Sequence, residues 1–190
     1  MKQTGAVLLL LLMLSGCSSE NRELAQAMAL RSRLLAAESC SFTADITADY
    51  GDSLQKFTLD CQGNSQGTVR FRVAAPEEIS GISGTLDQEG GSITFDGHAL
   101  QFDYLTDDQL SPVSAPWIFL RTLRGGYLAA AGREGETVHL LAKDSYQEDA
   151  LSLDIWLEAG NIPIRGEIFY RNRRILTLEI RDFRMESPHA

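Results

Sequence analysis

The sequence predicts an α+β domain in which one antiparallel sheet of about ten or eleven strands carries two helices. Residues 21–38 have the period of an amphipathic helix, whereas apolar and polar residues alternate with a period of two from residue 40 onward. Turn signals such as Asp96-Gly97 recur at short intervals, and a second helical segment interrupts the strands near residues 115–124. Strands joined by tight turns, with helices at two places only, indicate an antiparallel sheet.

The N-terminus carries an apolar run of nine residues, Ala6 to Leu14, after Lys2, followed by Leu14-Ser15-Gly16-Cys17. This pattern resembles the signal of a bacterial lipoprotein, whose lipobox ends in cysteine. Such a run is too short to span a bilayer of roughly 30 Å but suits a cleavable signal. The resemblance implies that residues 1–16 are removed and that Cys17 is lipidated, which anchors an exported protein to a membrane of the cell envelope. Residues 17–20 then form a short tether, and residues 21–190 form one domain. An ordinary secretory signal is the alternative.

The first helical segment has one broad apolar face. At about 100° per residue, six side chains share that face. They are Leu24, Ala27, Met28, Leu30, Leu34 and Leu35. A face of this kind is typical of a helix that packs against a hydrophobic core.

The next segments predict a hairpin with a turn at Tyr50-Gly51. A register in which paired residue numbers sum to 101 places Phe42 opposite Leu59 and Cys40 opposite Cys61, all on the apolar side. Because an exported protein meets an oxidising environment, this register favours a Cys40–Cys61 disulfide. Two buried free thiols are the alternative.

Short strands continue to the end of the chain, interrupted by the second helix. The expected strands are 69–73, 82–86, 93–95, 100–104, 137–142, 151–157, 162–170 and 175–183. Ser114 suits the N-cap of the helix, Pro116 its first turn and Gly125-Gly126 its end. This helix is apolar on nearly all sides and must therefore be covered on more than one side.

Charge and motifs exclude several classes of function. The formal net charge is −9, and loss of Lys2 makes it −10, which argues against a nucleic-acid partner. The three histidines, His98, His139 and His189, lie apart from one another and from cysteine, so we expect no metal. Gly81-Ile82-Ser83-Gly84 lacks the spacing of a nucleophile elbow. We therefore expect no cofactor and no enzymatic activity.

The apolar faces of so many strands exceed what two helices can cover. A curled sheet with a helix across its mouth would leave a cavity for an apolar ligand. The candidate lining residues are Phe42, Ile46, Phe57, Leu59, Val69, Phe71, Phe95, Leu100, Phe102, Trp117 and Leu120. A packed core made of the same residues is the alternative.

Two aromatic residues are predicted on the outer face of the sheet. The odd positions of 151–157 are apolar, so Trp156 points the other way, and Phe169 of the following strand shares its face. Aromatic side chains on a polar face mark an interface with an envelope protein or a second copy of the chain. The alternative is that a loop or the first helix covers them.

Residues 21–185 combine the order of elements given above with the segment Ala75-Pro76-Glu77-Glu78-Ile79-Ser80-Gly81 and, near the end, with Trp156, Ile162-Pro163 and Glu167-Ile168-Phe169-Tyr170. This pattern resembles the outer-membrane lipoprotein carriers, the LolA/LolB-like half barrels. It implies an incomplete antiparallel barrel wrapped around the two helices, with a cavity for acyl chains and no catalytic residues.

The resemblance implies two functions. The first is a non-catalytic, membrane-anchored lipoprotein that binds acyl chains or a lipoprotein. The chain is also similar to the spore germination lipoproteins of clostridia. The alternative function is therefore a regulatory lipoprotein that binds, positions or activates an envelope or cell-wall enzyme.

Overall fold

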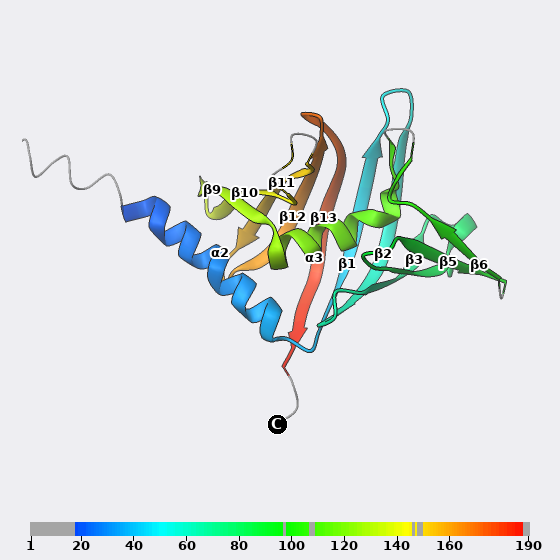
Figure 1. Ribbon diagram of the computed structural model, residues 1–190, viewed down its shortest axis with the longest axis horizontal. Helices are drawn as coiled ribbons and strands as arrows, with labels where there is room; N and C mark the ends of the chain where they lie inside the picture. Colours follow the sequence, from blue (N-terminus) through cyan, green and yellow to red (C-terminus); the bar gives the residue numbers. More distant parts are fainter. Residues whose placement is uncertain (1–17, 97, 107–108, 146, 148–149, 188–190) are drawn as a thin grey trace, which may run out of the picture.

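The computed structural model describes residues 18–96, 98–106, 109–145, 147 and 150–187 (Figure 1). The expected signal peptide, Cys17 and His189 lie outside these residues. Within them, no helix combines the length and the apolar character that crossing a membrane requires.

Eleven strands form one antiparallel sheet that does not close on itself. They are β1 (Ser39–Asp49), β2 (Leu54–Asn64), β3 (Val69–Ala75), β4 (Ser83–Leu86), β5 (Gly91–Phe95), β6 (His98–Phe102), β9 (Tyr127–Glu134), β10 (Thr137–Lys143), β11 (Ser152–Glu158), β12 (Ile162–Tyr170) and β13 (Arg173–Glu186). Their order is β6-β5-β4-β3-β2-β1-β13-β12-β11-β10-β9, so the first and last strands pair in the middle and β6 and β9 are the edges. The expected incomplete barrel is confirmed.

Shorter elements complete the chain. Strands β7 (Leu105–Thr106) and β8 (Gln109–Leu110) form a separate two-stranded ribbon, and η1 (Glu77–Ile79) and η2 (Pro112–Ser114) are single turns of 3₁₀ helix. The two longer helices are α2 (Ser18–Ala36) and α3 (Ala115–Gly125). Both helices were expected close to these positions.

The register of the β1–β2 hairpin differs from the expected one by two residues. Phe42 lies opposite Cys61, and Cys40 lies opposite Gly63 rather than opposite Cys61. A shift of two residues keeps every side chain on its own face, so the alternation alone cannot select between these registers. Packing against α3 favours the observed one, because a Cβ at position 63 would lie 2.8 Å from Leu120 Cδ1.

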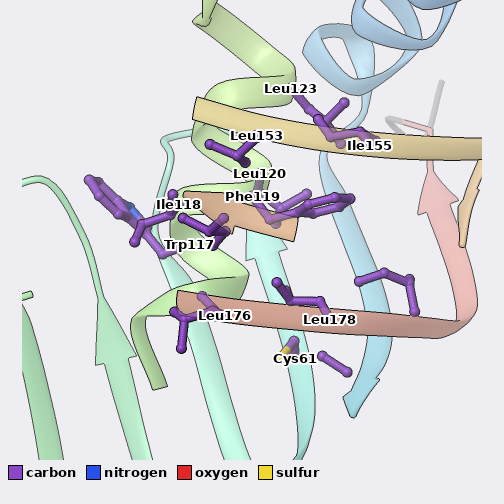
Figure 2. Close-up of a cluster of buried hydrophobic side chains, with 14 of the residues drawn as sticks. Cys61, Trp117, Ile118, Phe119, Leu120, Leu123, Leu153, Ile155, Leu176 and Leu178 are labelled. Carbon is purple, nitrogen blue, oxygen red and sulfur yellow. The ribbon is translucent and has the colours of Figure 1, made fainter. Parts of the chain in front are cut away.

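Helix α3 supplies much of the core. Its buried residues are Ala115, Pro116, Trp117, Ile118, Phe119, Leu120, Thr122 and Leu123. Figure 2 shows Phe119, Leu120 and Leu123 among apolar side chains of the strands, including Leu153, Ile155, Leu176 and Leu178. The expectation that this helix is covered on several sides is thus met. Ser114 precedes the helix, but its hydroxyl donates to Ser111 O (2.5 Å) and does not cap it.

A glycine of β12 allows the close approach of α3. A Cβ added at Gly166 would lie 2.8 Å from Phe119 Cδ2. We expect Gly166→Ala to lower the free energy of unfolding by about 1–3 kcal/mol, because the Phe119 ring has to leave its rotamer. Gly132→Ala in β9 is the matched control, since its Cβ would meet no heavy atom within 4 Å. Equal stability of the two variants in urea unfolding would contradict this packing.

The buried face of α2 is narrower than the apolar face predicted from the sequence. Ala27, Leu30 and Leu34 are buried in the core cluster, whereas Leu24, Met28 and Leu35 are exposed. The helix contacts β9 and α3 along one flank (Figure 1), and these elements cover only that flank. Strand β9 itself was not expected, because Leu128 to Gly132 is a run of small and apolar residues without alternation.

Candidate apolar groove

A groove of about 690 Å³ lies between α3 and two turns of the sheet. One turn (65–67) joins β2 to β3, and the other (87–89) joins β4 to β5. The volume falls within the roughly 300–1,000 Å³ of sites that hold small ligands. The lining residues are Leu35, Ser65, Gln66, Gly67, Asp87, Gln88, Glu89, Trp117, Leu120, Arg121, Arg124 and Gly125.

Trp117 forms a rigid wall of this groove. Its indole Nε1–H donates to Gly67 O (3.0 Å), and its ring stacks on Tyr104 with the centroids 4.6 Å apart. The guanidinium of Arg121 lies 4.6 Å from the centre of the same ring. Because its polar atom is paired and its ring is held by two neighbours, Trp117 presents a fixed apolar surface to the groove.

Tyr104 holds the second turn in place. Its hydroxyl donates to Gly90 O (2.6 Å) and also lies in contact with Asp87 O. Burial raises the pKa of Tyr104 to about 12, so the phenol stays protonated at physiological pH and keeps its donor. The turn that forms the far wall of the groove is therefore tied to the ring that stacks on Trp117.

Two arginines of α3 add positive charge. Arg121 forms an ion pair with Asp144 (2.5 Å), and Arg124 Nη1 donates to Asn64 O (2.7 Å). The Nε and Nη2 atoms of Arg124 are buried and have no acceptor among the residues that the structure describes. An unpaired buried donor is costly. The facing turn brings the opposite charge to the same groove, through Asp87 and Glu89.

Of the eleven predicted lining residues, Trp117 and Leu120 lie in the groove. Five others are buried in the core, and two are half-buried against it. The five are Phe42, Ile46, Leu59, Val69 and Phe71, and the two are Phe57 and Phe102. A packed core, the alternative stated for these residues, accounts for most of them.

The prediction is wrong for Phe95 and Leu100. Their side chains are 64% and 67% exposed, near the tip of the β5–β6 hairpin. Strand β6 is an edge of the sheet, whereas α3 lies mainly against other strands, β2, β10, β12 and β13. Alternation marks the face on which a side chain lies, but it does not show how far the covering helix extends.

The sequence did not reveal most of the groove's lining. Gln66 and Glu89 lie in turns that are separated by more than twenty residues, and Leu35 comes from the helix. Polar turn residues carry no local signal that they converge. Arg121 and Arg124 follow Trp117 at helical spacing, and this spacing is the signal that would have pointed to them.

Cys40 and Cys61 are buried free thiols in this structure. In the observed register Cys40 lies opposite Gly63 and Cys61 lies opposite Phe42, so the two cysteines are not cross-strand partners as the predicted register required. Burial raises the pKa of both thiols, most strongly that of Cys61.

We expect the reduced chain from Ser18 onward to react slowly with a thiol reagent at pH 8, because the thiolate is the reactive form. Absorbance during labelling would measure this rate. Unfolding in guanidinium should release both thiols at once. Rapid labelling of the folded protein would contradict the burial, and absence of labelling after unfolding without reductant would reveal a disulfide.

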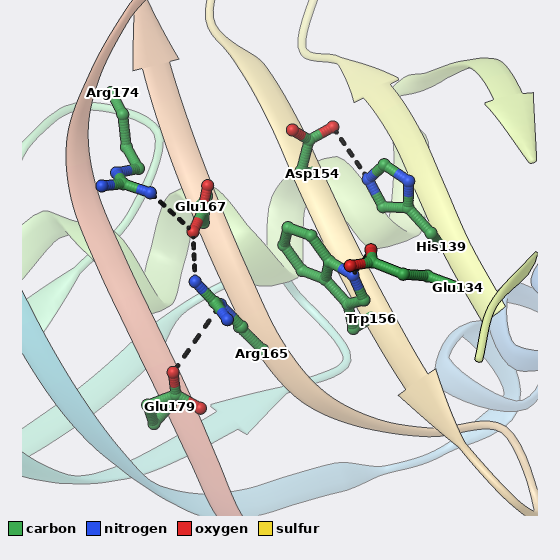
Figure 3. Close-up of polar contacts among 8 residues, drawn as sticks. All are labelled: Glu134, His139, Asp154, Trp156, Arg165, Glu167, Arg174 and Glu179. Carbon is green, nitrogen blue, oxygen red and sulfur yellow. Dashed lines mark hydrogen bonds and ion pairs between the residues drawn. The ribbon is translucent and has the colours of Figure 1, made fainter. Parts of the chain in front are cut away.

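Trp156 and Phe169 share the outer face of the sheet, as predicted. Trp156 lies opposite Arg165, and Ser152 lies opposite Phe169, so both aromatic residues point away from the core. The ring of Trp156 stacks on His139 (centroids 4.7 Å apart), and the Arg165 guanidinium lies 5.0 Å from its centre. The side chains of His139 and Arg165 thus contact the Trp156 ring on the outer surface of the sheet (Figure 3).

A network of charges surrounds Trp156. Its Nε1–H donates to Glu134 (2.7 Å), and His139 lies 3.1 Å from Asp154. Glu167 is buried and accepts from Arg165 and Arg174 (Figure 3). These contacts hold the outer face in one arrangement. Whether it meets a partner stays a prediction.

The described part of the chain contains no group of three or more His, Cys, Asp or Glu side chains able to hold a metal ion. His98 is exposed on β6, and His139 pairs with Asp154 as described. The third histidine, His189, is outside the described residues.

No protein-family model and no curated protein sequence matches the chain. Solved structures do. A DUF1329 family protein from Desulfovibrio piger is 6% identical, with 90% of this chain and 95% of that chain covered and a TM-score of 0.50. A LolA superfamily protein from Nitrosomonas europaea is 7% identical over 86% of this chain and 94% of that chain, with a TM-score of 0.44. The lipoprotein LppX of Mycobacterium tuberculosis is 11% identical over 85% and 93%, with a TM-score of 0.43.

At sequence identities this low, a similarity between structures shows a shared fold and nothing more. The likeness to the Desulfovibrio protein extends over nearly the whole of both chains. It agrees with the eleven-stranded open sheet and its two helices. The chain therefore shares the fold of that protein, an incomplete antiparallel barrel with two helices.

Proposed function

We propose that this protein is a non-catalytic lipoprotein, anchored to a membrane of the cell envelope through Cys17, that binds the acyl chain of an amphiphile in the groove. The observation that carries this proposal is the groove itself. It has about 690 Å³ of space beside a fixed apolar wall, Trp117 and Leu120, within a sheet that does not close. Apolar area removed from water is the main source of affinity for such a ligand.

The two walls of the groove differ in charge, with Arg121 and Arg124 on α3 and with Asp87 and Glu89 on the β4–β5 turn. An acidic head group would lie on the α3 side, beside the two arginines. Hydrogen bonds between a guanidinium and a carboxylate or phosphate are among the stronger ones in proteins. The ligand class is therefore a fatty acid, a phospholipid or the acyl chains of a lipoprotein.

The anchor is supported by the sequence around Cys17. Leu14-Ser15-Gly16-Cys17 resembles a lipobox, and α2 begins at Ser18, directly after the lipidated position. Two or three acyl chains on one residue anchor a protein stably, whereas a single chain does not.

Native mass spectrometry tests the ligand. The chain from Ser18 onward contains every described helix and strand and lacks the anchor. After incubation with palmitic acid we expect one added mass per chain. Arg124→Gln should weaken palmitic acid binding roughly tenfold, because a charge-assisted hydrogen bond is lost, and leave hexadecanol binding unchanged. An unchanged apo mass in excess fatty acid would contradict the proposal.

A second candidate function rests on the outer face. Trp156 and Phe169 lie on that face beside charged side chains such as Arg165 and Glu167. Aromatic residues with charged neighbours suit an interface with a protein partner such as an envelope or cell-wall enzyme. Trp156→Ala should weaken binding to that partner, whereas Gln55→Ala, an exposed substitution on β2, should not. Equal partner binding by both variants would remove this candidate.

A further inference from the structure

Helix α2 is held to the body of the protein along one side only. Leu30 and Leu34 are buried on this side, where the helix contacts β9 and α3. Arg31 fixes the contact, because its Nε donates to Leu123 O (2.8 Å) and its Nη2 to Gly126 O (2.7 Å) at the end of α3. The helix therefore cannot roll to bury another face without breaking these bonds.

The neighbouring side of α2 exposes an apolar stripe. Leu24, Met28 and Leu35 are 39%, 45% and 61% exposed. At about 100° per residue they lie within roughly 40° of one another around the helix axis. The exposed positions that continue this surface are small. They are Ala25, Ala29, Ser32 and Ala36.

The exposed side of the helix carries little charge. Arg22 lies at its margin, about 160° around the helix axis from Leu24. The other two arginines are bound to the protein itself, because Arg31 donates to Leu123 O and Gly126 O, and Arg33 Nη1 donates to Gly160 O (3.0 Å). The described segment from Leu24 to Ala36 contains no acidic residue. A helix with an exposed apolar stripe and no acidic residue beside it suits the plane of a membrane interface.

The stripe is continuous with the groove. Leu35 belongs to both, since it ends the stripe in the last turn of α2 and also lines the groove beside Leu120. A helix of 19 residues is about 28 Å long. Its first turn follows Cys17 in the sequence, and Leu35 in its last turn lines the groove.

We propose that the exposed face of α2, defined by Leu24, Met28 and Leu35, lies on the surface of a phospholipid bilayer and opens the groove toward it. This proposal rests on the proposed function in one respect, the anchor at Cys17. Lipid on Cys17 would hold the first turn of α2 at the bilayer, because no linker separates the two. An acyl chain then passes between bilayer and groove beside Leu35 without crossing bulk water.

Quenching of an added tryptophan tests this contact. The chain from Cys17 onward is coupled through the Cys17 thiol to a maleimide lipid in phosphatidylcholine vesicles with brominated acyl chains. This tether replaces the biological anchor, and Cys40 and Cys61 are buried away from the reagent. Met28→Trp places an indole on the stripe. Leu54→Trp is the matched control, because Leu54 is 61% exposed on β2, away from α2.

We expect a blue shift and loss of most of the added emission for Met28→Trp, and neither for Leu54→Trp, after subtraction of the signal from the unsubstituted chain. Circular dichroism of both variants checks the fold. No quenching of Met28→Trp, or equal quenching of both variants, would overturn the bilayer contact. The same result is expected if a protein, and not the bilayer, covers this face. Native mass spectra of the untethered chain report the groove separately, so either proposal can fail alone.

Discussion

Replacing Phe119 by alanine should lower the free energy of unfolding by about 3–5 kcal/mol, the largest single-residue loss of stability that we expect in this chain. The ring is fully buried between α3 and the sheet, where Gly166 leaves room for it. Its removal takes apolar contacts from the helix and from the strands together and leaves a cavity. Urea unfolding followed by circular dichroism measures the change.

Phe95→Ala is the matched control for this prediction. The same side chain is removed at a position that is mostly exposed on β5, so we expect a loss below about 1 kcal/mol. If Phe119→Ala does not fold, Phe119→Leu should still be less stable than the unsubstituted protein. A loss for Phe119→Ala no larger than that for Phe95→Ala would show that α3 is not the centre of the core.

Replacing Gln66 by tryptophan should reduce acyl-chain binding roughly tenfold or more, because the new side chain occupies the space that the ligand needs. Gln66 is exposed in the turn that joins β2 to β3 and lines the groove. The turn keeps its own bonds in the variant, since the backbone N–H of residue 66 donates to Asn64 Oδ1 (3.0 Å). Titration with palmitic acid by native mass spectrometry measures the loss.

Gln55→Trp provides the comparison. Gln55 is exposed on β2 and does not line the groove, so we expect unchanged binding and unchanged stability. Equal binding by Gln66→Trp and Gln55→Trp would place the ligand somewhere other than the groove. A lower thermal midpoint of Gln66→Trp, in contrast, would point to damage of the turn and would be visible in the same samples.

The alternation of apolar residues was enough to predict most strands of this fold, because it records which face of a sheet is buried. It could not set the register of the first hairpin, since a shift of two residues leaves Cys40 and Cys61 on the same face. The choice between registers depends on α3, whose side chain Leu120 needs a glycine at position 63. That requirement is a tertiary contact, and the sequences of the two strands alone do not reveal it.

The groove was harder to predict than the fold for the same reason. Trp117 and Leu120 were identifiable from the apolar helix that carries them, but Gln66 and Glu89 meet that helix only after the sheet has curved. The helical period of residues 21–38 predicted the apolar side chains of α2 correctly and did not show which of them would be covered. Exposure of Leu24 and Met28 follows from the position of β9, a strand without alternation.

The two tryptophans of the chain permit the most direct test of the groove. A ¹⁵N–¹H correlation spectrum of the chain from Ser18 onward should contain two indole signals, from Trp117 at the groove and Trp156 on the outer face. On addition of palmitic acid we expect the Trp117 signal to shift and the Trp156 signal to stay in place. A shift of Trp156 alone, or of neither indole at saturating fatty acid, would contradict the assignment of the groove as the acyl-chain site.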